Sequence, residues 1–562
     1  MKKTSIILIL ILVLSFFLRL SGINFGLPSK NLALTTYNPD EPLSFYPMEK
    51  WDPKKLYFHP GRALLWGGFH LYVLATLVKT GQIIGIVKLG PREFLINNLK
   101  EVDKLYIIGR LLMIISGVLS VFLIYLICKK SFDEKTGLIA GFIFAILPAH
   151  IVNSFYVRPD ALMIFFALVS VWYSLKIIET GKFKFYVLSS FFVGLATATK
   201  LSGAVYGIFP LTAHFLSKKS EQYSEGLTPL EKGGWGGFLR LFSIPFICLI
   251  GFIIGCPYSV IDFNSSSESF LHYLKINFSL SRGTMNPGQE ILFGTGWKSY
   301  FTYYLPYGIG LPLLITGVAG AILTSYRILK NNLYTKKFDI LFFISGIIIF
   351  YVISSTRNQV IWYTLPVLPF FAIFSARLFR ILLENFNKIF ATVILIIVSG
   401  YTLIYSIANL NLYIEKNVRE EASEWIEKNI PKGSIIAIPK SYFWTPAVLR
   451  QYNPPYKLLI GVDDPNLGYS DGIIGLKKYL NETEYIVLSE FEFREFVHPK
   501  IKQNFPEQAR VLDEILNSKK FIKVAEFDKE AKFLWFKFKK NYPPGDWLIP
   551  NPKILIFKKL EI

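Results

Sequence analysis

Two adjacent carboxylates, Asp40 and Glu41, lie in the segment that follows the first long apolar run, and His59 lies later in the same segment. A carboxylate held just outside a bilayer can act as a general base that takes a proton from a hydroxyl or an amine. A second carboxylate beside it can orient the acceptor or change the pKa of the first by like-charge proximity. The alternative is an ordinary solvated acidic loop in which His59 only fixes a turn.

Cationic side chains lie at the ends of several later apolar runs. Arg158 and Asp160 flank a proline, and Lys200 and Arg357 also stand where an apolar run begins or ends. Such cations can bind a phosphate group. They can equally form an interfacial ion pair or extend toward lipid head groups. Arg282, in a later polar segment, is a weaker candidate of the same kind.

The composition excludes a soluble globular protein, because 52% of the residues are hydrophobic and 16% are aromatic. Apolar runs near the roughly 20 residues that span a bilayer recur along the chain. The first run lacks a small-residue cleavage site after it and therefore indicates a retained helix. We expect a polytopic α-helical membrane protein with about eleven crossings, near residues 5–20, 105–128, 137–153, 159–176, 185–200, 202–217, 240–257, 298–326, 339–355, 359–377 and 389–411.

The net charge of +21 raises the question of a nucleic-acid partner. Lys and Arg are concentrated in loops and in the C-terminal region, and no nucleic-acid-binding motif accompanies them, so anionic membrane lipids are the expected partners. Cys128, Cys248 and Cys256 have no metal-ligand spacing and predict neither a disulfide framework nor a zinc site. We expect no cofactor, although adjacent carboxylates are a chemistry that can bind a divalent metal.

Basic residues gather in alternate short loops, which predicts a cytoplasmic N-terminus. The same alternation places the first loop, 21–104, outside. It holds only if the apolar stretch 62–89 lies in the interface and does not cross. Residues 413–562 change to a soluble composition, with strand-like runs at 434–438, 485–489 and 553–557 and helix-like runs such as 419–428. We therefore expect a membrane domain over 1–412 and an extracytoplasmic α/β domain over 413–562.

Several short motifs follow one another along the chain in a fixed order. They are Asn38-Pro39-Asp40-Glu41, Phe58-His59-Pro60, Tyr156-Val157-Arg158-Pro159-Asp160, Ala198-Thr199-Lys200 and Trp362-Tyr363-Thr364-Leu365-Pro366-Val367-Leu368-Pro369. This order resembles a known family, the polyprenyl-phosphate-sugar-dependent glycosyltransferases of the GT-C fold. The similarity is to the dolichyl-phosphate-mannose protein mannosyltransferase and aminoarabinose transferase group, and it covers about the first 410 residues. The chain departs from that group in having Gly61 after His59-Pro60 and in lacking an inserted lumenal domain.

The resemblance implies transfer of a sugar from a polyprenyl phosphate, dolichyl or undecaprenyl, to a glycan, lipid or protein acceptor outside the membrane. It implies that Asp40 is the general base of a single inverting displacement, assisted by Glu41. It further implies that Arg158, Lys200 and Arg357 bind the donor phosphate, without an obligatory metal. The supporting residues would be His59, Asp160 and Arg282. The plasma membrane of a prokaryote is the expected location.

Two other functions compete with this hypothesis. One is a transporter or lipid flippase of the cell-envelope glycan pathway, and the other is a non-catalytic assembly protein. Transporters place ionisable groups near the middle of helices and often carry repeated halves. This chain has its charges near one face and no repeat, so surface chemistry is favoured.

Overall fold

The computed structural model describes residues 3–217, 234–283, 287–330, 336–462 and 469–560. In that part of the chain, eight helical segments are long and apolar enough to cross a membrane. The chain is therefore an integral multi-pass membrane protein. These segments are Lys3–Leu20, Leu99–Ser131, Asp160–Thr180, Gly236–Gly255, Leu311–Lys330, Lys337–Ser354, Ile361–Asn385 and Lys388–Asn429.

The expected count of eleven crossings is not confirmed. The run 137–153 is broken by Pro148, which has no backbone N–H to continue a helix and instead begins a new one. The run 202–217 forms two short helical pieces, and 185–200 forms a helix of 17 residues. Gly310, with φ of 82°, separates the first part of 298–326 from the long helix that follows.

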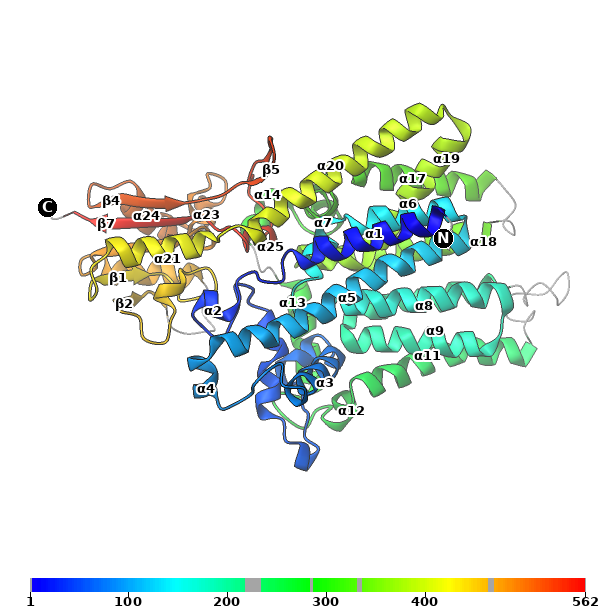
Figure 1. Cartoon of the computed structure of the whole chain (residues 1–562), viewed down its shortest axis with the longest axis horizontal. Coiled ribbons are helices and arrows are strands. Elements are labelled where there is room, and N and C mark those ends of the chain that lie inside the picture. The colour runs from blue at the N-terminus through cyan, green and yellow to red at the C-terminus, as the bar shows by residue number, and fades with distance from the viewer. Residues whose placement is uncertain (1–2, 218–233, 284–286, 331–335, 463–468, 561–562) are drawn as a thin grey trace.

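The helices of the bundle pack side by side, with α5 against α8, α8 against α9 and α9 against α11 (Figure 1). Apolar side chains such as Leu10, Phe246 and Ile396 are more than 60% exposed on its outer faces, as expected for surfaces that contact lipid. The bundle comprises α1 Lys3–Leu20, α5 Leu99–Ser131, α6 Glu134–Ala145, α7 Pro148–Asn153, α8 Asp160–Thr180, α9 Phe183–Thr199, η5 Leu201–Gly207, α10 Ile208–Phe215, α11 Gly234–Gly255, α17 Leu311–Lys330, α18 Lys337–Ser354, η10 Ile361–Val367, α19 Leu368–Asn385 and α20 Lys388–Ile414.

Short helices gather at one end of this bundle, the end opposite the N-terminus (Figure 1). The expected interfacial stretch contains a helix, α3 Phe69–Ile83, that is not among the eight candidate spans. The short helices are α2 Pro28–Asn31, η1 Glu41–Ser44, α3 Phe69–Ile83, α4 Arg92–Asn97, α12 Tyr258–Ile261, α13 Phe270–Arg282, α14 Pro287–Phe293, α15 Gly296–Ser299, the π-helix η8 Tyr300–Tyr304 and α16 Leu305–Ile309.

A mixed sheet with the order β2-β1-β3-β7-β4 lies at the same end. The strands expected near 434–438, 485–489 and 553–557 are confirmed as β1, β3 and β7. The C-terminal elements are α21 Val418–Asn429, β1 Ile435–Ile438, β2 Lys457–Ile460, α22 Tyr469–Leu476, β3 Tyr485–Ser489, α23 Glu490–Val497, α24 Pro506–Leu516, β4 Phe521–Phe527, β5 Ala531–Phe533, β6 Phe536–Phe538, α25 Gly545–Leu548 and β7 Ile554–Lys559.

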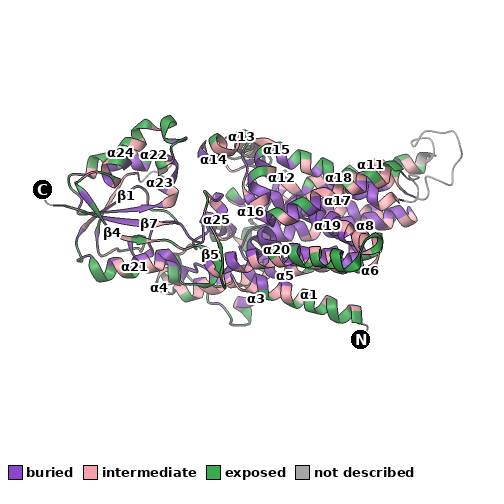
Figure 2. Ribbon diagram, turned by 90° about the horizontal axis from the view of Figure 1, so that it is seen from above, coloured by how far each residue is buried: buried purple, intermediate pink, exposed green. Residues whose placement is uncertain are grey.

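The sheet is covered on both faces, with α22, α23 and α24 on one side and α21 on the other (Figure 2). Successive residues of a strand point to opposite faces. Accordingly Ile486 and Leu488 pack with α22 and α24, whereas Val487 packs with α21. The sheet and the helices on its two faces confirm the α/β character expected for 413–562. The division of the chain at residue 412 stays a prediction.

Because the first loop and the sheet lie at one end of the bundle and the α8–α9 turn at the other, residues at the two ends should label from opposite sides. We expect cysteines at Lys54 and Glu482 to react with the same membrane-impermeant reagent that leaves a cysteine at Lys184 unlabelled. All three positions are exposed, and the unsubstituted chain, whose own cysteines are buried or half-buried, supplies the background. Labelling of Lys54 and Lys184 from one side would contradict this arrangement.

Candidate active site

Glu41 is completely buried and paired with Arg110, a buried residue of α5. The two guanidinium contacts are 3.0 Å to Oε1 and 2.7 Å to Oε2. The Val157 N–H and the Thr36 hydroxyl donate further bonds to the same carboxylate, at 2.9 and 2.6 Å. Both carboxylate oxygens are thus satisfied, as a buried charge requires.

This pairing ties the first loop to the turn between α7 and α8. Besides the Val157 N–H that Glu41 receives, the Ser44 hydroxyl donates to the Val157 carbonyl at 2.8 Å. Arg110 also donates to the Ile23 and Phe25 carbonyls, both at 2.8 Å. Asp40, which directly precedes η1, is therefore held beside Arg158.

Arg158 lies between two carboxylates. Its Nη1 is 3.3 Å from Asp40 Oδ2, and its Nε is 4.0 Å from Asp160 Oδ2. Its other terminal nitrogen donates to Asn153 Oδ1, and its guanidinium carbon is 4.2 Å from the centre of the Trp362 ring. The Arg158 side chain is 3% exposed but that of Asp40 is 30% exposed, so Asp40 is the member of this pair open to an incoming group.

Lys200 joins the same cluster through Asp160. Its Nζ is 2.6 Å from Asp160 Oδ1, and it lies 5.4 Å from the centre of the Tyr363 ring. Two of the three predicted donor cations, Arg158 and Lys200, therefore converge on one carboxylate. Two cations and two carboxylates, Asp40 and Asp160, balance each other at this place.

The backbone of the first loop positions Lys200. The Leu201 N–H donates to the Trp66 carbonyl at 2.7 Å, and Gly67 and Lys200 form an isolated β-bridge. A side chain at Gly67, whose φ is 150°, would meet the Ala198 carbonyl oxygen at 2.2 Å. Only glycine allows this approach. The loop that carries Asp40 therefore packs directly against the backbone of residues 198–201.

The other predicted residues lie in separate contacts. Arg357 is 54% exposed and forms an ion pair with Glu290 at 2.6 Å, so it is not among the contacts of Arg158 or Lys200. Arg282 lies over the Phe278 ring at 5.9 Å. His59 accepts a bond from the Gly61 N–H at 2.9 Å, as expected of a turn-fixing residue, and its Nε2 faces Asp262 at 3.3 Å.

Three important residues were missed by the sequence analysis. Arg110 was hidden inside a long apolar run, where an unexplained cation is itself a sign of a buried partner. Asn153 precedes the arginine motif without any recognisable pattern. Asp546 comes from the far end of the chain, where its Oδ2 accepts from the Ile361 N–H at 2.7 Å. Burial raises the pKa of Asp546 to about 7, against the opposing effect of Arg158.

The described residues contain no group of three His, Cys, Asp or Glu side chains that could hold a metal ion. The nearest partners of Asp40 and Asp160 are cations. The absence of a cofactor stays a prediction.

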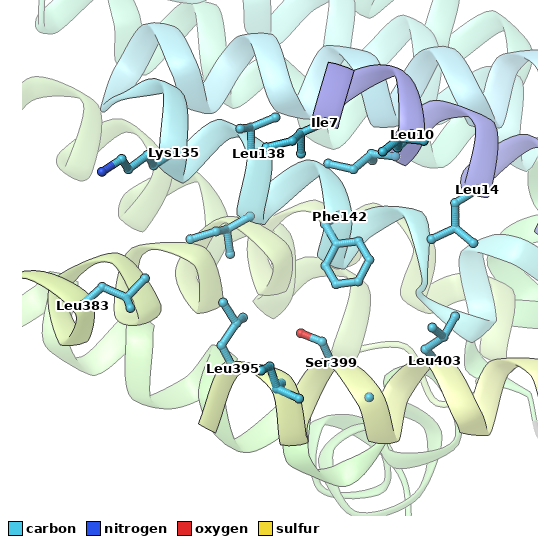
Figure 3. Close-up of a pocket in the computed structure, with 14 residues that line it drawn as sticks. Ile7, Leu10, Leu14, Lys135, Leu138, Phe142, Leu383, Leu395, Ser399 and Leu403 are labelled. Atoms are coloured by element: carbon cyan, nitrogen blue, oxygen red, sulfur yellow. The ribbon is translucent and has the colours of Figure 1, made fainter. Parts of the chain in front are cut away.

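A groove of about 720 Å³ lies elsewhere, between α1, α6, α19 and α20 (Figure 3). Apart from Lys135 and Ser399 its wall is apolar, with residues such as Leu14 and Phe142 turned toward the space. None of its lining residues belongs to the charged cluster. Its composition suits lipid chains, and its lining includes no carboxylate and no histidine.

Comparison with known proteins confirms the resemblance that the motifs indicated. The sequence model of the family described as dolichyl-phosphate-mannose-protein mannosyltransferase matches residues 102–225. "Putative mannosyltransferase YkcB" of Bacillus subtilis (strain 168) is 35% identical over 96 residues, which are 17% of this chain and 13% of that protein. The chain thus matches only a small part of the length of this relative.

Solved structures are similar over most of the chain. The apo oligosaccharyltransferase of Archaeoglobus fulgidus superposes with a TM-score of 0.50 and 13% identity, covering 96% of this chain and 75% of that one. The similarity confirms the GT-C fold class. Apo ArnT from Cupriavidus metallidurans gives a TM-score of 0.46 and 12% identity over 98% and 97% of the two chains.

Removing the charge of Glu41 should unfold the site. We expect Glu41→Gln to lower the free energy of unfolding by about 3–5 kcal/mol, because Arg110 would remain buried without its partner. Thermal unfolding in detergent, followed by tryptophan fluorescence, measures this. Glu101→Gln removes a partly exposed ion pair on α5, the helix of Arg110, and should change stability by less than about 1 kcal/mol. Equal melting of the two variants would contradict the structural role of Glu41.

Proposed function

We propose that this protein is a glycosyltransferase that moves a sugar from a polyprenyl phosphate to an acceptor at the extracytoplasmic face of the membrane. The observation that carries the proposal is the cluster of Asp40, Arg158, Asp160 and Lys200 at one end of a membrane helix bundle. The partly exposed Asp40 provides a base, and Arg158 beside it, joined to Lys200 through Asp160, provides an anion-binding site.

In this mechanism Asp40 takes the proton of the acceptor hydroxyl or amine as that atom attacks the anomeric carbon. The bond between the anomeric carbon and the phosphate oxygen breaks, and the polyprenyl phosphate leaves with the electron pair. Arg158 and Lys200 stabilise the negative charge on the departing phosphate. Attack opposite the leaving group inverts the anomeric centre.

The remaining predicted residues receive more limited roles. Glu41 has all its hydrogen-bonding capacity engaged by Arg110, Val157 and Thr36, so we assign it to positioning Asp40. Asp160 holds the two cations together, and His59 fixes the loop. We assign Arg282 no contact with the donor phosphate, and Arg357 could contact a donor only after leaving Glu290.

The competing hypothesis of a transporter or flippase is less well supported by this arrangement. The cluster lies where helices begin or end and in the first loop. A translocation pathway would need ionisable groups along the membrane interior. The name of the matched family, a mannosyltransferase family, also supports group transfer.

We further propose that the N-terminus is cytoplasmic and that residues 21–104 and 413–562 lie outside a prokaryotic plasma membrane. Cations retained on the cytoplasmic side support this orientation. The labelling pattern predicted above, determined in intact cells, tests it, because Lys54 and Glu482 should then be the accessible positions.

The mutation Asp40→Asn should separate chemistry from binding. Turnover with a panel of polyprenyl-phosphate sugars, starting with dolichyl phosphate mannose, should fall about 100- to 10,000-fold because the base is lost. Donor affinity should change little, whereas Arg158→Ala should weaken donor binding. Asp52→Asn, a half-buried change in the same loop, is the matched control. Turnover of Asp40→Asn close to that of the control would exclude Asp40 as the base and favour the transporter hypothesis.

Chelation of divalent cations tests the proposed metal-free mechanism. Since Arg158 and Lys200 supply the positive charge at the phosphate, we expect turnover in excess EDTA to equal turnover without it. Addition of Mg²⁺ or Mn²⁺ after removal of the chelator should give no stimulation. Loss of turnover in EDTA that Mn²⁺ or Mg²⁺ restores would assign an essential metal to the site.

A further inference from the structure

We propose that Asp546 is a positioning residue of the donor site. It holds in place the rings of Trp362 and Tyr363, which lie beside Arg158 and Lys200, and it sets the net charge around Arg158. The inference rests on the proposed function. It concerns a residue from the C-terminal region, more than 300 positions from the other charged members of the cluster.

The segment that carries Asp546 is fastened into the membrane domain. Trp547 and Ile549 belong to the large hydrophobic core formed by the bundle helices. The Trp547 Nε1–H donates to the Tyr405 hydroxyl of α20 at 3.1 Å, and Arg494 donates to the Pro543 carbonyl at 2.8 Å. Helix α25 is therefore fixed both to the bundle and to the C-terminal sheet domain.

The Asp546 carboxylate in turn fixes the start of η10. It accepts the Ile361 N–H at 2.7 Å, and Ile361 is completely buried. The next two residues are Trp362, 4.2 Å from the Arg158 guanidinium carbon, and Tyr363, 5.4 Å from Lys200 Nζ. The hydrogen bond that Asp546 accepts therefore anchors the segment whose two aromatic rings lie beside Arg158 and Lys200.

Asp546 also acts on the charge balance. The charged groups whose electrostatic effect reaches its carboxyl are Arg158, Asp40 and Asp160. Burial raises its pKa to about 7, Arg158 lowers it, and the two carboxylates raise it. The charge of Asp546 also acts on three phenols, those of Tyr304, Tyr363 and Tyr413. They are neutral near pH 7, because an ordinary phenol has a pKa of about 10.

The protonation state of Asp546 should decide how strongly the site attracts a phosphate. With neutral Asp546 the two cations and two carboxylates cancel, and with ionised Asp546 one negative charge is in excess. An anionic donor is therefore bound more weakly as the pH rises through about 7. Asp546→Asn keeps an oxygen that can accept the Ile361 N–H but cannot ionise.

Binding of dolichyl phosphate mannose between pH 6.0 and 8.5 tests this, because its phosphodiester carries one charge throughout. We expect the full-length protein in detergent to bind about tenfold more weakly at the upper pH, and Asp546→Asn to bind equally at both. Asp513→Asn, an exposed change in α24, should behave as the unsubstituted protein. Asp546→Ala also loses the hydrogen bond from Ile361, so it should bind dolichyl phosphate mannose more weakly than Asp546→Asn at every pH. The same pH dependence in Asp546→Asn as in the control would overturn the inference.

Stability against pH separates this inference from the proposed function. The folded-state pKa of Asp546 is about 7 and its ordinary value 3.8, so its contribution to stability is complete below pH 4 and is lost as the pH rises to 7. Asp546→Asn should remove that part of the decline, without any donor present. An unchanged decline would contradict the inference, whereas failure of the unsubstituted protein to bind any donor would contradict the proposed function.

Discussion

The buried ion pair between Glu41 and Arg110 is the contact on which the active-site geometry depends. Removing two charges from water is unfavourable unless each is fully hydrogen-bonded. Here the carboxylate receives bonds from the loop, from α5 and from the turn before α8. Because the pair is satisfied only when all three segments meet, it fixes the position of Asp40 relative to Arg158.

A membrane helix bundle can place charges safely only at its ends or inside a paired cluster, since an unpaired charge at the bilayer centre costs about 3 kcal/mol or more. Arg158, Lys200, Asp40 and Asp160 satisfy this condition by pairing with one another. The same pairing holds the cations in place without a donor, so an incoming phosphate would compete with the carboxylates for them. Resting stability and readiness for an anion therefore have one physical origin.

The C-terminal region completes the site as well as covering one end of the bundle. Trp547 and Ile549 pack in the hydrophobic core of the helix bundle, and Asp546 accepts a hydrogen bond from the segment that carries Trp362. The soluble sheet and the membrane helices are thereby mechanically connected through a few buried residues. The hairpin of β5 and β6, whose Ala531 packs with Ala408 and Leu412 of α20, provides a second connection.

The sequence by itself determined the class of protein, most of the long helices and the strands β1, β3 and β7, and it selected the motifs around Asp40, Arg158 and Lys200 as candidates for the site. These features are local, because the length of an apolar run, the alternation along a strand and each motif depend only on residues that are neighbours in the sequence. Tertiary structure alone decided that Glu41 faces Arg110, that Arg357 pairs with Glu290, and that Asp546 reaches Ile361. Those contacts join residues 69, 67 and 185 positions apart. No local pattern specifies such partners, because which distant charge satisfies a buried group depends on how the helices and the C-terminal domain pack.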